Sequence, residues 1–387
     1  MDTTKSVLET FYTRWILNFK RNIRDMKNSR RTFIRNLAIL PLASLGIPKV
    51  FMTSCISAKQ PSNPHNPIVN HPDGTKTQNL NHYYKQMQKV SFNNRDWKVA
   101  ADIHLPMDFD PNKKYAAIVC VHPGSSVKEQ TAGRYAARMA QNGFVALAFD
   151  ASFQGESGGE PRYLEDPATR VEDIRCAIDY LTTLEYVDEA RIGLMGICAG
   201  GGYAANAALT ERRVKAVATV VGTSASRAFG ESDAISTLEA VGKQRTAQAR
   251  GASAMIVPWT PASAKDAQEK GSAEFDMLGA IDYYRTPRGA YPTANNKLLF
   301  NSMSALVVFD AYHLAERYLT QPLLIIVGDQ VGAFGSYRDG FTLFNKAASI
   351  NKKIHVVKGA SHYDLYDQPE ATVEALKKLI PFFQKNL

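Results

Sequence analysis

The stretch Arg191–Ala204, RIGLMGICAGGGYA, joins an apolar run to a cysteine and a series of small residues. Gly196, Cys198 and Gly200 form the pattern G-x-C-x-G, which is the spacing of a nucleophile elbow: a sharp turn from a buried strand into a helix, with a reactive side chain at its tip. The flanking positions must be small because strand and helix nearly touch there, and the N–H groups of the new helix favour a thiolate. The alternative is a core cysteine in a glycine-rich turn, since free cysteine is often buried.

Apolar runs and helical patterns alternate on both sides of this stretch. Residues 87–104 begin the body with two strand patterns joined by a turn at residues 93–96. Residues 167–184 carry apolar side chains at helical spacing, so one stripe of this helix faces a core. The pattern predicts an α/β fold with a mostly parallel sheet, helices on both faces and an antiparallel start. The continuous apolar runs expected for strands buried on both faces are residues 115–123, 144–150, 214–222, 322–328 and 352–359.

The formal charge of +9 is concentrated at the N-terminus of the 387-residue chain. Residues 1–54 hold ten of the 46 Lys and Arg residues but three of the 37 Asp and Glu residues. The rest of the chain therefore has 36 basic and 34 acidic residues, a net charge of about +2. This distribution argues against a nucleic-acid-binding protein.

The N-terminal segment has the features of an export signal. Residues 29–35, SRRTFIR, precede the apolar LAILPLASLGIP, and this order is similar to a twin-arginine signal spanning residues 1–54. MTSC at residues 52–55 resembles a lipobox, in which cleavage exposes Cys55 for lipid attachment. We expect an exported protein, either free in the periplasm or attached to a membrane as a lipoprotein; the alternative is an unprocessed basic leader. Residues 1–25 are unusual before such a signal, and Met26 is the expected start of translation.

Residues 55–84 are rich in Pro, Asn and Ser and are expected to form a tether to the body at residues 85–387. Cys120, Cys176 and Cys198 remain in the body, an odd number without a close pair. A disulfide scaffold is therefore not expected, and at least one thiol should stay free.

Four blocks follow one another within residues 85–387: HPGSSVKEQTAGRYA, AFDASFQGESGGEPR, GICAGGGYA and GASHYDLYD. In this order they resemble an α/β-hydrolase of the dienelactone hydrolase-related branch, where G-x-C-x-G is common. The resemblance implies an α/β-hydrolase fold, and the site has to carry any claim about the reaction.

The resemblance assigns a catalytic triad in the order nucleophile, acid, histidine. Cys198 is the expected nucleophile, and His362 after the last strand is the expected base. The family position of the acid is occupied by Val331, so Asp329 is the expected acid, with Asp339 and Asp364 as the other candidates. A cysteine–histidine pair needs less help from an acid than a serine does.

The oxyanion hole is expected from the backbone N–H of Ala199 and from Gly124 or Ser125 in the HPGSS turn. His122 is interpreted as a residue that holds this turn, and Lys128 with Glu129 as an ion pair that anchors the loop. Neither a phosphate-binding loop nor a metal-ligand spacing is present, so no cofactor and no metal are expected.

About a hundred residues, 223–321, separate two predicted strands that need only a short crossover. We expect this insertion to form a helical lid over the elbow. Some of its aromatic residues should line an apolar acyl or aromatic pocket, while most should form the lid's own core. These aromatic residues are Trp259, Tyr283, Tyr284, Tyr291, Phe300, Phe309 and Tyr312.

Together these features predict an esterase-type hydrolase that cleaves a small-molecule carboxylic ester, lactone or thioester through an acyl intermediate on Cys198. A second hypothesis is a cysteine-dependent acyltransferase, in which the lid excludes water and another acceptor takes the acyl group. A third is a lipid-anchored binding protein on a hydrolase scaffold without catalysis.

Overall fold

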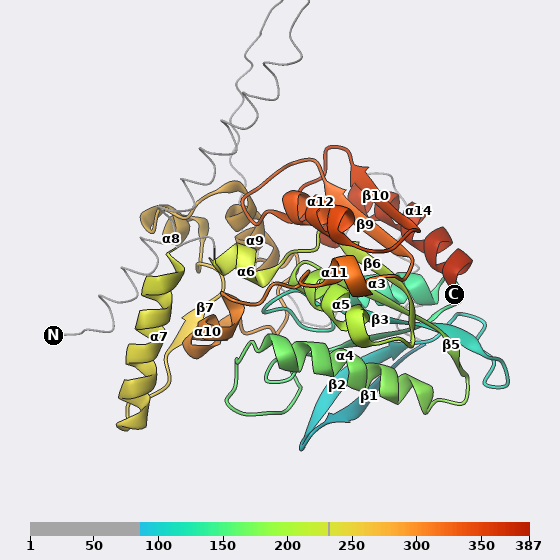
Figure 1. Cartoon of the computed structure of the whole chain (residues 1–387), viewed down its shortest axis with the longest axis horizontal. Coiled ribbons are helices and arrows are strands. Elements are labelled where there is room, and N and C mark those ends of the chain that lie inside the picture. The colour runs from blue at the N-terminus through green and yellow to red at the C-terminus, as the bar shows by residue number, and fades with distance from the viewer. Residues whose placement is uncertain (1–85, 231–232) are drawn as a thin grey trace, which may run out of the picture. The chain divides into compact units, whose positions relative to one another are not determined.

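The computed structural model describes residues 86–230 and 233–387 (Figure 1). The predicted export signal (1–54), Met26, Cys55 and the tether (55–84) lie outside these residues. Within the described part of the chain, no helix has both the length and the apolarity needed to cross a membrane.

An eight-stranded sheet forms the centre of the domain, in the order β1-β2-β4-β3-β5-β6-β9-β10. The first pairings, β1 with β2 and β2 with β4, are antiparallel, and the remaining pairings are parallel. This order confirms the predicted antiparallel start and parallel body. The strands are β1 (Met87–Asn94), β2 (Trp97–His104), β3 (Tyr115–Val121), β4 (Val145–Phe149), β5 (Val187–Ile197), β6 (Val214–Val220), β9 (Leu323–Gly328) and β10 (Lys352–Val357).

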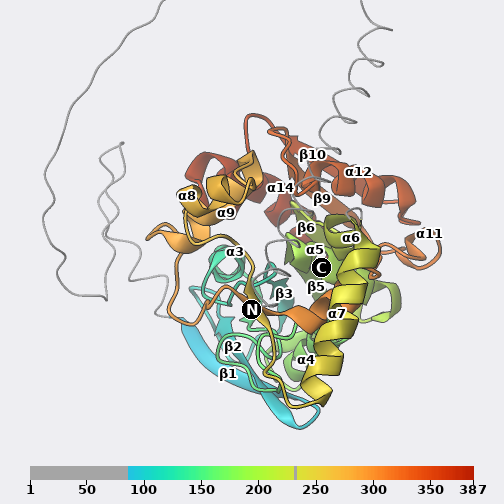
Figure 2. The same ribbon diagram turned by 90° about the vertical axis from the view of Figure 1, so that its left-hand side faces the viewer.

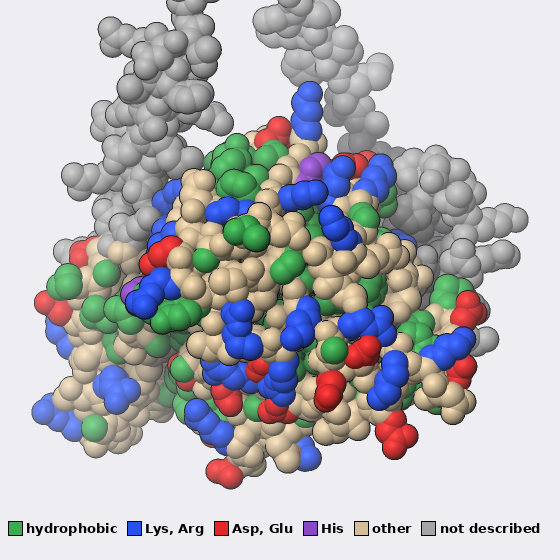
Figure 3. All heavy atoms as spheres, turned by 45° about the vertical axis from the view of Figure 1, so that its right-hand side comes forward, with side chains coloured by type: hydrophobic (Ala, Val, Ile, Leu, Met, Phe, Trp, Pro, Cys, Tyr) green, Lys and Arg blue, Asp and Glu red, His purple; other side chains and the backbone are tan. Residues whose placement is uncertain are grey.

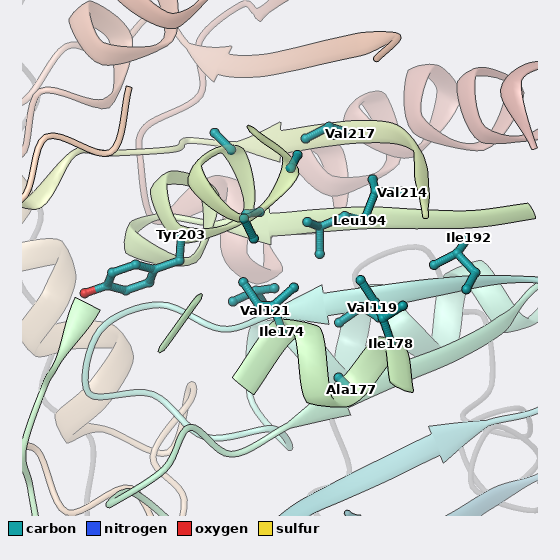
Figure 4. Packing of buried hydrophobic residues seen from close by; sticks show 14 of the residues in the cluster. Val119, Val121, Ile174, Ala177, Ile178, Ile192, Leu194, Tyr203, Val214 and Val217 are labelled. Atoms are coloured by element: carbon teal, nitrogen blue, oxygen red, sulfur yellow. The ribbon is translucent and has the colours of Figure 1, made fainter. Parts of the chain in front are cut away.

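Helices cover both faces of the sheet, which explains the long apolar runs of its central strands. In β3, Ile118 and Cys120 face α3 and α14, whereas Val119 and Val121 face α4 and α5 (Figures 1 and 4). Cys120 is therefore a core residue with no exposure, as the sequence predicts. These helices are α3 (Thr131–Ala140), α4 (Pro167–Thr182), α5 (Ala199–Thr210), α12 (Ser336–Lys346), the short α13 (Asp364–Asp367) and α14 (Pro369–Asn386).

The helical stripe predicted for residues 167–184 packs as expected. Ile174 and Ile178 of α4 are fully buried and lie against Val119 of β3 and Leu194 of β5 (Figure 4). Burial of each such aliphatic side chain contributes about 1.5–3 kcal/mol to folding. This layer holds α4 and α5 against the strands whose carboxyl ends carry the candidate site.

The segment between β6 and β9 consists of helices and a two-stranded hairpin, and parts of it pack into the cores on both faces of the main sheet (Figures 1 and 2). It has a small apolar core of its own, which includes Val241, Leu298 and Phe300. Its elements are α6 (Ala225–Gly230), α7 (Ala234–Ala249), β7 (Ile256–Pro258), α8 (Ala264–Glu269), α9 (Phe275–Arg285), β8 (Lys297–Leu299), a 3-10 turn (Phe300–Ser302), α10 (Met303–Leu306) and α11 (Ala315–Tyr318).

Basic and acidic side chains both occur across the face shown in Figure 3. The mixture agrees with the near-balanced charge that the sequence gives to the body.

Candidate active site

Cys198 lies at the turn between β5 and α5, with a backbone φ of 54° and ψ of −126°. A cysteine rarely adopts a positive φ, and such strain is common at functional turns. The turn is fixed by its neighbours: the Cys198 N–H donates to the Val220 carbonyl (3.0 Å), and the Cys198 carbonyl accepts from Gly201 (2.9 Å) and Thr223 (3.0 Å). The backbone therefore has the geometry of the predicted elbow.

The two flanking glycines are required by close backbone contacts. A Cβ on Gly196 would lie 2.1 Å from the carbonyl oxygen of Gly200, and one on Gly200 would lie 2.3 Å from that of Val121. These contacts also place the start of α5 beside the end of β3. The turn after β3, with Gly124 and Ser125, is thereby brought to the elbow.

The backbone N–H groups at this position can bind an oxyanion. The Ala199 N–H is the first of α5, directly after Cys198, and it acts to lower the pKa of the Cys198 thiol. Within the described residues, the N–H groups of Gly124 and Ser125 donate to no protein acceptor. Ser125 itself has a positive φ of 56°, so the turn is held in an uncommon conformation. N–H donors that are oriented and have no other acceptor can stabilise the negative charge that develops on a carbonyl oxygen.

His122 and Arg170 hold the oxyanion turn from behind. The His122 Nε2 accepts from the Ala151 N–H (2.9 Å), which leaves Nδ1 to donate to the Pro123 carbonyl (2.5 Å). Arg170 donates to the His122 carbonyl (2.6 Å). Burial and the Arg170 charge keep the pKa of His122 well below its ordinary value. His122 is thus a neutral structural residue, as predicted.

Lys128 is a buried anchor rather than a reactive group. Its Nζ lies 2.6 Å from a carboxylate oxygen of Glu129, 3.2 Å from one of Asp150 and 2.6 Å from one of Glu156. These bonds tie the loop after β3 to the loop after β4, which confirms the predicted Lys128–Glu129 ion pair.

His362 lies after β10 with 2% of its surface exposed. Its Nδ1 is 3.1 Å from the Ser336 hydroxyl, and its Nε2 is 3.3 Å from the Tyr366 hydroxyl. The Cys198 sulfur lies 3.9 Å from the Thr223 hydroxyl oxygen, and Tyr366 acts to lower the pKa of its thiol. No direct hydrogen bond joins His362 to Cys198 in the described part of the chain. Tyr366 therefore interacts with both predicted residues.

Burial keeps both reactive groups uncharged. It raises the pKa of Cys198 above its ordinary value of 9.0, although hydrogen bonds from Tyr366, Ala199 and Thr223 act in the opposite direction. It lowers the pKa of His362 to about 3. The expectation of a thiolate favoured by the helix terminus is wrong for this state, because desolvation outweighs the effect of the Ala199 N–H.

Alkylation of Cys198 by iodoacetamide should therefore be slow at pH 7 and increase about tenfold per pH unit up to at least pH 9. A thiol with a pKa above 9 is less than about 1% ionised at pH 7, and the thiolate is the reactive form. Peptide-resolved mass spectrometry separates Cys198 from the other cysteines. A plateau of the Cys198 rate below pH 8 would contradict this assignment.

None of the three predicted acids contacts His362. The carboxylate of Asp329 accepts from the Gly359 N–H (2.6 Å) and closes the turn region beyond β9 and β10. Asp339 accepts from the Ser224 N–H and pairs with Arg227 (2.6 Å). Asp364 accepts from the Ser361 N–H at the start of α13. The assignment of Asp329 as the orienting acid is therefore corrected: that carboxylate binds backbone, and a serine hydroxyl takes its place at the imidazole.

Asp329→Asn should change kcat/KM by less than about threefold. The carbonyl oxygen of the introduced amide can still accept from the Gly359 N–H, so the turn is preserved, and no bond to His362 is lost. Steady-state hydrolysis of an ester that wild type cleaves measures the effect. A loss of a hundredfold or more with an unchanged melting temperature would restore Asp329 as the triad acid.

A carboxylate of the insertion, Asp276 in α9, lies near the position where the family acid was sought. It accepts from the Phe334 N–H (2.7 Å), and a Cβ on Gly332 would lie 2.1 Å from its carboxylate. Burial raises the pKa of Asp276 to about 6, and its charge in turn raises the pKa of Cys198. No sequence pattern connects this residue with the site.

Some of the insertion's aromatic residues reach the site. Trp259 packs on Gly124 at the oxyanion turn, where a Cβ would lie 3.1 Å from the indole ring. Tyr283 and Tyr284 pack on Tyr366, with ring centroids 5.0 Å and 6.4 Å from that of Tyr366. Phe300 instead belongs to the insertion's own core.

Arg288, which follows α9, connects the insertion to the segment that carries His362 and Tyr366. Its guanidinium donates to Asp367 (2.6 Å) at the end of α13 and to the Tyr363 carbonyl (2.8 Å). It also pairs with Asp282 of α9 (2.8 Å). The insertion is thus joined by charge-assisted bonds to the catalytic loop.

The sequence did not single out Ser336 and Tyr366. Tyr366 follows His362 by four residues within the block GASHYDLYD, a spacing at which side chains on one helical turn meet. Ser336 has no distinguishing signal. Within the described residues, no group of three or more His, Cys, Asp and Glu side chains is arranged to hold a metal ion.

Comparisons with known proteins identify the family of this chain. The family model described as "Serine aminopeptidase, S33" matches residues 113–369. The uncharacterized protein YcjY of Escherichia coli K12 is 46% identical over 310 residues, which cover 77% of this chain and 99% of YcjY.

Other relatives cover similar lengths. The crystal structure of the hypothetical protein PA2218 from Pseudomonas aeruginosa is 32% identical, covers 78% of this chain and 94% of its own, and has a TM-score of 0.68. The polyketide transferase ClaH of Penicillium crustosum is 26% identical over 65% of this chain and 82% of its own. The chain therefore belongs to the serine aminopeptidase S33 family and is an α/β-hydrolase enzyme in which a cysteine occupies the tip of the elbow.

Proposed function

We propose that the protein is a hydrolase that cleaves a carboxylic ester, lactone or thioester through an acyl intermediate on Cys198. The observation that carries this proposal is the position of Cys198 at the tip of the elbow, directly before the first N–H of α5. The N–H groups of Gly124 and Ser125 and the neutral imidazole of His362 complete the groups that acyl transfer requires.

In the acylation step, the Cys198 S–H bond breaks, its proton passes to the imidazole of His362, and the sulfur bonds to the acyl carbon. The oxyanion is stabilised by Ala199 and by the turn at Gly124 and Ser125. The tetrahedral intermediate collapses, and the leaving alcohol or thiol takes the proton from the imidazolium. In the second step His362 removes a proton from water, whose oxygen attacks the thioester; the acid leaves and the Cys198 thiol re-forms.

In the resting protein Cys198 and His362 are both uncharged. This supports a mechanism in which the thiol loses its proton while the sulfur attacks the acyl carbon. An imidazole with a pKa of about 3 is a weak base. It gains basicity when the developing oxyanion and the enclosed substrate replace part of its apolar surroundings. A preformed thiolate–imidazolium pair is not needed.

The substrate class is expected to carry an apolar or aromatic acyl group. Trp259 at the oxyanion turn and Tyr284 beside Tyr366 supply apolar surface on the insertion side of Cys198. The four sequence blocks that resemble the dienelactone hydrolase-related branch support esters and lactones of small acids.

Acyl transfer is the second candidate. It is favoured by the similarity to ClaH, a polyketide transferase, and by the insertion that packs against the elbow. The non-catalytic alternative is favoured by the serine in place of an acid at His362.

Mass spectrometry after incubation with p-nitrophenyl and thioester substrates separates these functions. An acyl mass on the Cys198 peptide that disappears in water supports hydrolysis. An adduct that persists until an alcohol or amine is added supports transfer. The absence of any adduct across acyl chains of different length would overturn both and leave a binding protein.

For the N-terminal region, we propose export guided by residues 1–54 and lipid attachment at Cys55. The residues SRRTFIR and MTSC support this proposal. Cell fractionation combined with intact-mass analysis of the mature N-terminus tests it. A mature chain that begins before residue 55 and carries no lipid would overturn lipid attachment.

A further inference from the structure

The turn after β6, residues 221–224, contacts Cys198 through Thr223. The Thr223 N–H donates to the Cys198 carbonyl (3.0 Å), and the Thr223 hydroxyl oxygen lies 3.9 Å from the Cys198 sulfur. Because sulfur is larger than oxygen, a hydrogen bond to it spans a longer distance than one between two oxygens. Thr223 is 6% exposed, and its hydroxyl makes no other hydrogen bond within the described residues.

The backbone of this turn is strained where it leaves the strand. Val221 has a φ of 43°, and a β-branched residue in this region is a genuine outlier. At Gly222 a Cβ would lie 3.2 Å from that of Thr219 and 3.6 Å from the Gly201 Cα, so the chain passes closely behind the elbow. Such strain persists only where the surrounding structure imposes it, and it is concentrated at functional sites. The strain therefore points to a functional reason for the position of Thr223.

Hydrogen bonds on both sides keep the turn in place. The Val221 N–H donates to the Ile326 carbonyl of β9 (2.8 Å). The Ser224 N–H donates to the Asp339 carboxylate (2.8 Å), and the Ser224 hydroxyl accepts from the Ala311 N–H (3.1 Å). The residue between these anchors is thus oriented at the sulfur before the reaction begins, so little reorganisation accompanies the reaction.

The direction of the hydrogen bond between Thr223 and Cys198 is fixed once the thiol loses its proton. In the thiol, either the sulfur or the hydroxyl can donate. A thiolate has no proton to donate, so the threonine O–H becomes the donor. Hydrogen bonds to an ionised acceptor are stronger than neutral ones. The contact therefore stabilises the charged sulfur more than the resting thiol, and only such a difference accelerates a chemical step.

We propose that Thr223 is a catalytic residue that stabilises the negative charge on the Cys198 sulfur during acylation, an inference that rests on the hydrolase function proposed above. As the S–H bond breaks, the proton bonds to the imidazole of His362 and the electron pair stays on the sulfur. The Thr223 O–H donates to the sulfur while the sulfur bonds to the acyl carbon. The threonine proton stays on its oxygen, so Thr223 ends the step unchanged and no co-reactant is consumed.

The electrostatics of the thiol agree with this role. Burial raises the pKa of Cys198, and the Thr223 hydroxyl is one of the groups that act to lower it. A donor at the sulfur is most useful where water is excluded, because the thiolate then has few other groups to stabilise it.

Substitutions at position 223 separate the hydroxyl from the rest of the side chain. Valine keeps the shape of threonine and the N–H bond to the Cys198 carbonyl, and a methyl group 3.9 Å from the sulfur makes an ordinary van der Waals contact. Serine keeps the hydroxyl and loses the methyl group. Thr219→Val is the matched control: Thr219 lies in β6 behind the same turn, is 1% exposed, and within the described residues its hydroxyl has no hydrogen-bond partner.

Acylation by a p-nitrophenyl ester and alkylation by iodoacetamide should both slow by about three- to tenfold in Thr223→Val. Loss of a hydrogen bond to a charged group lowers the thiolate population about tenfold, and the greater nucleophilicity of a more basic thiolate offsets part of that loss. The pH at which the alkylation rate of Cys198 reaches its plateau should rise by about one unit, a shift that a purely structural role would not produce. Thr223→Ser and Thr219→Val should each react within about twofold of wild type.

Peptide-resolved mass spectrometry follows both reactions, and its outcomes separate this role from the proposed function. Wild type that forms no acyl adduct on Cys198 overturns the hydrolase function and the catalytic role of Thr223 with it. Wild type that is acylated while Thr223→Val reacts as fast as Thr219→Val overturns the role of Thr223 alone. Thr223→Ser as slow as Thr223→Val also overturns it, because the hydroxyl is then not the cause. Thr223→Ala removes the same hydroxyl and carries the same prediction if Thr223→Val does not fold.

Discussion

Cys198→Ala should abolish the acyl-enzyme and lower kcat/KM by at least about 10³-fold. The variant keeps the oxyanion donors of Ala199 and of the turn after β3, but it has no group to bond to the acyl carbon. The backbone conformation at position 198 is imposed by the hydrogen bonds to Val220 and Thr223, which alanine also makes, so folding should be retained. Ester hydrolysis and intact-mass analysis measure the two effects.

Cys198→Ser provides the sharper comparison, because serine is the nucleophile named in the description of the family. We expect kcat/KM to fall by about 10²-fold in this variant as well. A serine hydroxyl is harder to deprotonate than a thiol, and His362 is held by Ser336 instead of a carboxylate that would raise its basicity. Activity of Cys198→Ser equal to wild type would show that another group supplies the missing charge, with Asp276 the first to examine.

Gly196→Ala should destabilise the protein by about 3 kcal/mol or more and remove activity together with native structure. The new methyl group would lie 2.1 Å from the Gly200 carbonyl oxygen and 2.6 Å from the Gly201 nitrogen. Both are backbone atoms of α5, so the overlap is relieved only if the helix moves away from β5. Urea denaturation followed by circular dichroism gives the free energy of unfolding.

Gly242→Ala is the matched control for this substitution. Gly242 lies within α7, is exposed, and has no heavy atom within 4 Å of the position of a new Cβ. The same chemical change should therefore stabilise the protein by about 0.5–1 kcal/mol through helix propensity. Equal destabilisation by both substitutions would show that steric overlap at the elbow is not the cause.

The arrangement of the main chain could largely be predicted from the sequence. Continuous apolar runs can lie only in strands covered on both faces, and G-x-C-x-G around Cys198 indicates a turn that excludes side chains on both sides. The structural roles of His122 and Lys128 could also be predicted from the sequence. A histidine in a turn at the end of a strand typically holds that turn, and a neighbouring lysine–glutamate pair typically anchors a loop.

The proton-transfer groups could not be predicted in the same way. The family position of the acid is defined by distance along the chain from β9, and Asp329 is the carboxylate nearest to that position. Its side chain nevertheless turns toward Gly359, whose N–H it accepts from, and makes no bond to the imidazole. Ser336 and Tyr366 reach His362 through the packing of α12 and α13, which local sequence does not determine. The charge states also differ from expectation, because desolvation depends on the complete fold.

The guanidinium of Arg288 bonds both to α9 and to the segment around α13, so these two elements are expected to move together. A movement of α9 away from the catalytic domain must break the bonds from Arg288 to Asp367 and Tyr363, or it must draw α13 and Tyr366 with it. In the second case His362 loses its hydrogen bond to the Tyr366 hydroxyl. The position of the insertion and the hydrogen bonding of the base are therefore coupled, although α9 itself contributes no group to the base.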